Sequence, residues 1–152
     1  MLVNPNDPLD WLLGKLQRAR AVTPELMAEF VAGACSRLPL LNRTGKTAGD
    51  IAGLVQSSAW VDAALALIQL ELPGWTLRRL AYDEGEWHCA LSGQPALPVE
   101  LDDVADAHHE VLPLALMCAF LEVRRRAGAP RDQTVPQALQ AHTHAVCCDN
   151  FA

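Results

Sequence analysis

Two long runs of mainly apolar residues dominate the middle of the chain, at residues 59–72 and 113–126. In the first run, apolar residues recur three and four positions apart and spread into a wide arc. This pattern predicts a helix that is packed on more than one side. Ser57 and Ser58 stand where a side-chain oxygen can accept hydrogen bonds from the first helical turn. A proline-glycine pair at 73–74 ends the helix, because proline has no amide to donate and glycine tolerates the reversal.

The second run predicts another buried helix. Pro113 suits its first turn, and three arginines at 124–126 complement the negative end of the helix dipole. The apolar part is far shorter than the roughly 20 residues needed to cross a bilayer. We therefore expect a core helix and no association with a membrane.

The residues between these two helices predict a β-hairpin. Its strands are Trp75–Tyr82 and Glu86–Leu91, joined by Asp83-Glu84-Gly85. Gly85 can take the positive φ that a hairpin loop of three to five residues usually requires. In the first strand the apolar positions change phase across two arginines at 78–79, which indicates a β-bulge or a twist there. Apolar residues alternate again at 97–101 and predict a third, short strand.

Two further helices are predicted near the N-terminus. Asp7 and Thr23 each stand directly before a proline, and a capping side chain followed by proline is typical of a helix start. Each start is followed by apolar residues at helical spacing, so we expect a helical hairpin at 8–38. The polar, glycine-bearing residues 40–53 are expected to form a connector that contains a helical turn.

These elements predict an α+β fold. A small antiparallel β-sheet, made of the hairpin at 75–91 and the third strand, packs between helices in an α-β-α layered arrangement. A chain of 152 residues is long enough for a sizeable core, and residues 1–130 are expected to form one domain with its core at 57–126. Residues 131–152 are more polar and are expected to form a C-terminal appendage.

Net charge, the N-terminal residues and the cysteines indicate which partners and which location to expect. A formal net charge of -6 argues against a dedicated nucleic-acid binder, because such proteins depend on cationic contacts to phosphate. The N-terminus lacks the basic start and apolar segment of a signal peptide, so a cytoplasmic location is expected. Five cysteines, two of them adjacent, do not suit a disulfide framework. Cys35, Cys89 and Cys118 stand in apolar patterns that are typical of core positions.

The densest group of titratable side chains lies at residues 100–110, directly before the second buried helix. The main interpretation is a solvated acidic connector whose charges favour the positive end of that helix. Carboxylates and imidazoles are also the usual oxygen and nitrogen ligands of divalent metals. Asp106, His109 and Glu110 are therefore the candidate ligand-binding residues, provided that they converge on one point.

A second candidate site lies close to the C-terminus. His142, His144, Cys147 and Cys148 offer imidazole and thiolate donors, which suit zinc. Structural zinc sites usually take paired ligands from two separated segments, whereas these residues lie within one short segment. The alternative interpretations are an ordinary terminal segment, and redox or intermolecular disulfide chemistry.

Several segments resemble one known family. The helix residues 61–67, the Pro-Gly-Trp at 73–75, the hairpin and the Leu-Pro-Leu-Ala-Leu-Met-Cys-Ala run at 112–119 are similar to the phage ABA sandwich domain family. The Leu-Leu-Gly-Lys-Leu at 12–16 is in the same style, so the resemblance spans most of residues 9–126. Members occur in phages and bacterial genomes and have no known function, so the resemblance supplies no catalytic residues.

The sequence offers no complete catalytic constellation, such as a nucleophile with its base and an oxyanion loop. Together with the resemblance, this favours a non-enzymatic accessory protein of phage or prophage origin that acts through a protein partner or by self-association. The alternative is a small-molecule or metal-binding domain that uses the acidic connector before the second buried helix. No cofactor is expected for the favoured function.

Overall fold

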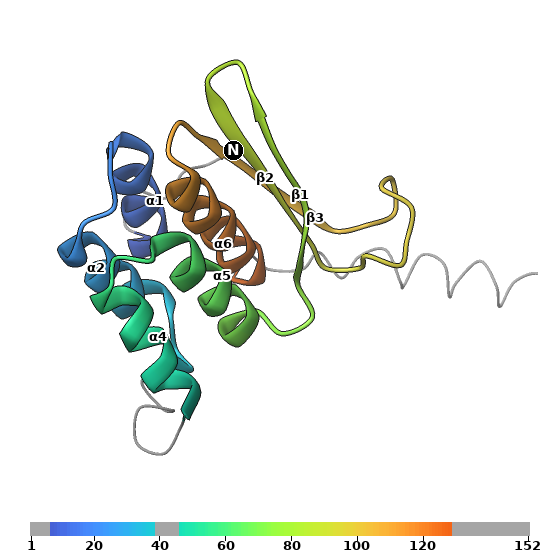
Figure 1. Cartoon of the computed structure of the whole chain (residues 1–152). Helices are drawn as coiled ribbons and strands as arrows, with labels where there is room; N and C mark the ends of the chain where they lie inside the picture. The colour runs from blue at the N-terminus through green and yellow to red at the C-terminus, as the bar shows by residue number, and fades with distance from the viewer. Residues whose placement is uncertain (1–6, 39–45, 129–152) are drawn as a thin grey trace, which may run out of the picture.

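The computed structural model describes residues 7–38 and 46–128. They form an α+β fold with an antiparallel sheet, which is the predicted class (Figure 1). The helices are α1 (Pro8–Arg18), α2 (Pro24–Ala34), α4 (Lys46–Gln56), α5 (Trp60–Glu71) and α6 (Leu112–Gly128). The strands are β1 (Thr76–Asp83), β2 (Glu86–Ser92) and β3 (Val104–His109), in the order β1-β2-β3. None of these helices is long and apolar enough to span a membrane.

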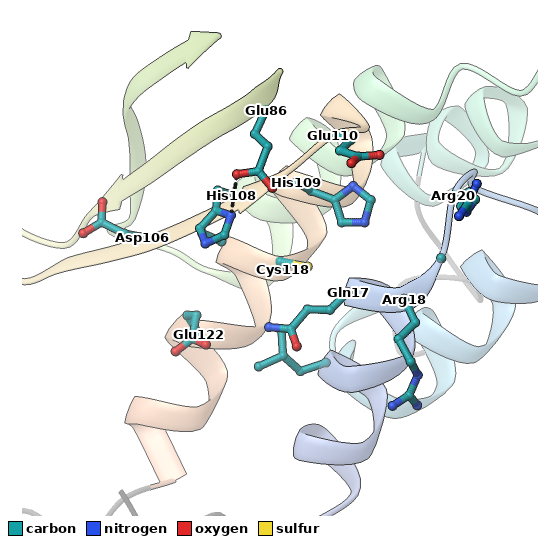
Figure 2. Close-up of a pocket in the computed structure, with 13 residues that line it drawn as sticks. Gln17, Arg18, Arg20, Glu86, Asp106, His108, His109, Glu110, Cys118 and Glu122 are labelled. Atoms are coloured by element: carbon teal, nitrogen blue, oxygen red, sulfur yellow. Dashed lines mark ion pairs between the residues drawn. The ribbon is translucent and has the colours of Figure 1, made fainter. Parts of the chain in front are cut away.

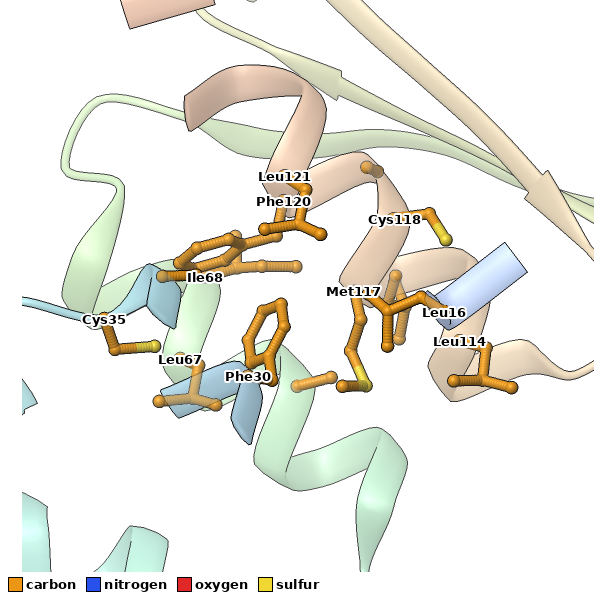
Figure 3. Packing of buried hydrophobic residues seen from close by; sticks show 14 of the residues in the cluster. Leu16, Phe30, Cys35, Leu67, Ile68, Leu114, Met117, Cys118, Phe120 and Leu121 are labelled. Atoms are coloured by element: carbon orange, nitrogen blue, oxygen red, sulfur yellow. The ribbon is translucent and has the colours of Figure 1, made fainter. Parts of the chain in front are cut away.

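Helix α6 lies at the centre of the molecule. Its residues 114–121 are each no more than 2% exposed, because α6 packs against β2 and β3 on one side and against α1 and α5 on others. The rings of Phe30 in α2 and Phe120 in α6 meet edge to face, with their centroids 5.0 Å apart (Figure 3). A helix that is apolar all round needs such an enclosure, as the run at 113–126 predicted.

The described helices all lie on one face of the sheet (Figure 1). The layers are therefore the sheet, then α6, then the outer helices, instead of a sheet between two helical layers. The other face, here called the open face, carries polar side chains that can stay in water, among them Arg79, His88 and His108. The α+β class and the antiparallel sheet agree with the prediction, whereas the order of the layers differs from it.

The predicted starts of the first two helices are confirmed. The Asp7 carboxylate accepts a hydrogen bond from the Leu9 amide at 2.9 Å. Thr23 Oγ1 accepts one from the Leu26 amide at 3.1 Å. Both helices bury their apolar side chains, and the predicted helical hairpin at 8–38 packs on the core helix α6.

The predicted serine cap of α5 is wrong, because the two serines end α4. Ser58 has a positive φ of 58°, and its amide donates to the Val55 carbonyl at 3.1 Å. The Ala59 amide donates to the Leu54 carbonyl at 2.9 Å. This pair of bonds is the Schellman arrangement that closes a helix C-terminus. The Ser57 hydroxyl also bonds to the Leu54 carbonyl, and Ala59 precedes α5 without a side-chain cap.

Helix α4 takes the place of much of the polar connector that was expected at 40–53. The sequence predicted only a helical turn there, since Gly49 and Gly53 each lower helix stability by about 1 kcal/mol relative to alanine. Ile51 is 2% exposed and belongs to the core. Burial of such a side chain contributes about 1.5–3 kcal/mol, so tertiary packing offsets the cost of the glycines.

The predicted hairpin is confirmed, and so is its bulge. β1 and β2 pair antiparallel, with a register shift between Leu77 and Arg79. The turn has two residues, Glu84 and Gly85, with φ of 50° and 86°, and not the predicted three, because Asp83 pairs with Glu86 as part of β1. Two positive φ angles in a two-residue loop define a type I′ turn, whose twist matches that of the flanking strands.

The predicted third strand at 97–101 is wrong. Val99 and Leu101 are 62% and 67% exposed in a loop, where Pro98 has no amide to donate to a strand. The third strand is instead β3, which lies within the expected acidic connector and pairs with β2. Its alternation is between small residues such as Ala105, which faces the core, and acidic ones such as Asp106, so its apolar signal is weak.

Candidate functional site

Strand β3 contains two of the three residues that were predicted to bind a ligand or metal, Asp106 and His109, and places them on opposite faces of the sheet. Asp106 lies opposite Ala90 on the open face of the sheet, whereas His109 lies opposite Trp87 on the face toward the helices. Glu110 follows the strand and is exposed. Residues three positions apart on a strand point to opposite faces, so the three side chains do not converge on one point (Figure 2).

His109 has a structural role at the end of β3. It is 7% exposed, and its Nδ1 accepts a hydrogen bond from the Val111 amide at 2.9 Å, which holds the turn into α6. Within residues 7–38 and 46–128 there is no group of three His, Cys, Asp or Glu side chains that could hold a metal ion. The C-terminal zinc candidates, His142, His144, Cys147 and Cys148, lie outside the described residues.

A groove of about 670 Å³ lies along the free edge of β3 (Figure 2). One wall is β3 itself, and Cys118 and Glu122 of α6 lie below it. The other wall is the C-terminal end of α1 with the residues that follow it, namely Leu13, Gln17, Arg18, Ala19 and Arg20. The groove thus brings together three elements that are far apart in the sequence.

The edge of β3 that borders this groove has free backbone groups. The Asp103 carbonyl accepts a hydrogen bond from the glycine after β2 at 2.8 Å. Because alternate residues of an antiparallel strand bond to the same neighbour, the amides and carbonyls of Asp106 and His108 point away from β2. The Val104 carbonyl, which belongs to the same set, accepts a hydrogen bond from Arg126. Two residues of β3 therefore have no strand partner on this side among the described residues and can pair with another strand.

Charged side chains line the groove in an uneven pattern. Arg18 and Arg20 are exposed on the α1 side. The side formed by the sheet and α6 carries the carboxylates of Glu86, Asp106, Glu110 and Glu122. Glu86 pairs with His108 Nδ1 at 3.1 Å, whereas Asp106 and Glu110 make no ion pair with any described residue. The groove therefore has a basic wall and an acidic wall.

The cysteines near the groove are not nucleophiles. Cys118 is 2% exposed, and burial raises the pKa of its thiol to about 12. Burial likewise raises the pKa of Cys89 and the pKa of Cys35 to about 12. The thiolate is the reactive form, so these three core cysteines are protonated and inert near neutral pH, and their predicted core positions are confirmed.

The sequence did not predict that residues at the end of α1 form a wall of the groove. Gln17, Arg18 and Arg20 form no motif, and their pattern is that of polar residues at the end of any amphipathic helix. They border β3 only because α1 packs on α6, which itself packs on the sheet. No local signal in the sequence reports that contact.

Comparisons of the chain with models of known protein families, with curated proteins and with solved structures give no match. The resemblance to the phage ABA sandwich family rests on the sequence segments described above and stays a prediction. Function is therefore inferred from the groove and from the strand that borders it.

Proposed function

We propose that this protein is a non-enzymatic protein-interaction module that binds an extended segment of a partner protein at the free edge of β3. The observation that carries the proposal is that this edge borders an open groove of about 670 Å³ with a helix end as its far wall. An unpaired strand edge is a template for an added strand. The walls of the groove restrict where such a strand can lie.

Main-chain hydrogen bonds supply much of the affinity in this mode of recognition. Asp106 and His108 each offer an amide and a carbonyl on the groove side. An added strand can make about four hydrogen bonds to these groups, each worth about 1 kcal/mol. The hydrogen bond of Arg126 to the Val104 carbonyl marks the end of the available edge.

The charges around the groove determine the chemistry of the segment. Asp106 and Glu110 favour basic side chains next to β3, and Arg18 and Arg20 favour acidic side chains next to α1. Pairs of opposite charge across neighbouring strands contribute about 0.2–1 kcal/mol each. A polar segment with both signs of charge therefore fits the groove better than an apolar one.

Catalysis and metal binding have less support than peptide binding. The three predicted ligands Asp106, His109 and Glu110 do not converge, and the nearby thiol of Cys118 is protonated. Among the described residues, no group of three His, Cys, Asp or Glu side chains could hold a metal ion for the alternative of a metal-binding domain. The phage-related origin and the cytoplasmic location stay predictions from the sequence.

Selection from a displayed library of random extended peptides identifies a segment that binds the protein, and that peptide is then the probe. NMR-detected hydrogen exchange reports which strand it joins. The amides of Asp106 and His108 are expected to exchange at least about tenfold more slowly in the complex, because each becomes hydrogen-bonded. Slower exchange along β1, with no change along β3, would contradict the proposal.

The Asp106→Pro variant tests the same pairing at β3 by mutation. It removes an outward amide without removing a hydrogen bond to β2, and proline is tolerated at such positions of edge strands. We expect it to weaken peptide binding at least about tenfold. Asp106→Asn keeps the amide and is the control for loss of the charge. Equal affinities of the Asp106→Pro variant and the unmodified protein would exclude pairing at this edge.

A further inference from the structure

Strand β1 forms the other edge of the sheet, and its exposed side chains include several apolar ones. Leu77, Leu80 and Tyr82 are 37%, 38% and 61% exposed. They lie on the same face as Cys89 and Trp87 of β2, but α6 covers β2 and β3 and leaves β1 uncovered (Figure 1). Large apolar side chains exposed on an edge strand mark an interaction surface.

The backbone of this edge also has no pairing partner in the part of the chain that the structure describes. Asp83 flanks the two-residue turn and is hydrogen-bonded across it to β2. By alternation along the strand, Ala81 also bonds to β2, whereas the amides and carbonyls of Leu80 and Tyr82 point outward. Residues 79–83 of β1 can therefore accept another strand.

The charges of this segment are arranged antisymmetrically about Ala81. Arg79 stands two positions before Ala81, and Asp83 stands two positions after it. Both side chains lie on the open face of the sheet, and neither forms an ion pair in the part of the chain that the structure describes. A strand of the same sequence running in the opposite direction matches each of these charges with its opposite.

We propose that a second copy of this chain pairs with β1 in the antiparallel direction, with Ala81 on the two-fold axis. In this register Leu80 exchanges hydrogen bonds with Tyr82 of the partner subunit. Arg79 lies opposite Asp83 of the partner subunit, and symmetry repeats both contacts. The two three-stranded sheets join into one, with the helices of both subunits on the same face.

If the two copies of β1 are shifted to a neighbouring register, Arg79 and Asp83 no longer lie opposite each other. Only shifts that keep outward-pointing residues opposite each other preserve the hydrogen bonds. With Leu80 or Tyr82 on the axis, Asp83 faces an apolar residue and no ion pair forms. With Ala81 on the axis, Leu80 and Tyr82 cover each other on the face toward the helices, so both faces of the joined sheet favour one register.

The dimer goes beyond the proposed peptide binding, because it uses the opposite edge of the sheet. The edge at β3 is less accessible to a whole subunit, since the end of α1 lies beside it and Arg126 bonds to the Val104 carbonyl. Pairing through β1 leaves both β3 grooves free at the outer ends of the joined sheet. The two proposals can therefore fail independently.

Ala81→Cys tests the position of the axis. Antiparallel neighbours that are not hydrogen-bonded have Cα atoms about 4.5 Å apart, which is within the range of a disulfide. In a chain that also carries Cys147→Ser and Cys148→Ser, mild oxidation of this variant is expected to give a covalent dimer linked at position 81, as located by mass spectrometry. Ala107→Cys is the control on the other edge strand: Ala107 is paired with β2 as Ala81 is, but its side chain lies on the face toward the helices. This variant is expected to stay monomeric under denaturing conditions.

Charge reversal tests the register. Arg79→Glu places like charges opposite each other and is expected to raise the dimer dissociation constant at least about tenfold in sedimentation equilibrium. Adding Asp83→Arg restores opposite charges and is expected to return the constant to that of the unmodified protein. The inference is overturned if the unmodified protein is monomeric at every concentration, if position 107 cross-links in preference to position 81, or if the double reversal does not restore dimers.

Discussion

At the scale of single residues, the side chain of Glu71 at the end of α5 makes more hydrogen bonds than any other among the described residues. Its carboxylate is buried and accepts hydrogen bonds from the amides of Ser36, Arg37 and Leu38 at 2.7 to 3.0 Å. Arg124 of α6 adds an ion pair at 2.9 Å. One carboxylate thus joins α5 to the segment after α2 and to α6.

Glu71→Leu is expected to lower the free energy of unfolding by about 3 kcal/mol, because it leaves the Arg124 guanidinium and three amides without their acceptor. Urea unfolding measures the change. Adding Arg124→Leu is expected to recover part of the loss, since the unpaired charge is removed. Unchanged stability of the Glu71→Leu variant would show that this carboxylate does not hold the three segments together.

Asp102 anchors the loop between β2 and β3, and it makes stability depend on pH. Burial opposes ionisation of its carboxyl, but hydrogen bonds from Ser92, Gln94 and Arg78 outweigh this and lower the pKa of Asp102 below the ordinary 3.8. A carboxyl with a lowered pKa stabilises the fold above its ordinary pKa, and this contribution is lost as pH falls through the folded pKa.

The stability advantage of the unmodified protein over Asp102→Asn is therefore expected to be constant near neutral pH and to shrink below pH 3.8. The melting temperatures of both proteins across the acid range measure this difference. A constant difference down to the most acid pH at which both are folded would contradict the lowered pKa.

At the scale of elements, local signals were sufficient where the element depends on close neighbours. The starts of α1 and α2 followed from Asp7 and Thr23, and the hairpin followed from Gly85 and the strands around it. α4 and β3 were missed because each is stabilised by distant partners. α4 needs the burial of Ile51, and β3 needs β2 beside it and α6 beneath it.

The type I′ turn of the hairpin predicts that one substitution lowers the free energy of unfolding and that another raises it. Gly85→Ala is expected to lower the free energy of unfolding by about 1 kcal/mol, because φ of 86° is unfavourable for a residue with a Cβ atom. Glu84→Asn is expected to raise it by roughly 0.5 kcal/mol, since asparagine adopts positive φ more readily than glutamate. Urea unfolding of both variants checks the pair, and changes of the same sign would be inconsistent with this turn.

At the scale of the whole molecule, α6 connects the sheet to the N-terminal helices. Leu16 of α1 and Leu67 of α5 are both fully buried, and both helices pack on α6. The core cluster includes residues from every described helix and from β2 and β3. We therefore expect the described residues to unfold as one cooperative unit.

Leu16→Ala and Leu67→Ala are each expected to lower the free energy of unfolding by about 2–5 kcal/mol. Far-ultraviolet circular dichroism and tryptophan fluorescence should report the same single transition for both variants. Leu101→Ala, in the exposed loop, is the control and is expected to change stability by less than about 0.5 kcal/mol. A separate early transition in the Leu16→Ala variant would show that α1 unfolds independently.

The sequence by itself determined the starts of α1 and α2, the two buried helices, the hairpin and its bulge. These features depend on capping side chains, on prolines and on the period of apolar residues, all of which act over a few neighbouring positions. Only the tertiary structure decided that β3 is a strand, that both edges of the sheet are free and that a groove lies beside one of them. The reason is physical: Asp106 and Arg18 share a groove only because α1 and β3 both pack on α6, and contacts between distant segments leave no periodic trace in the chain.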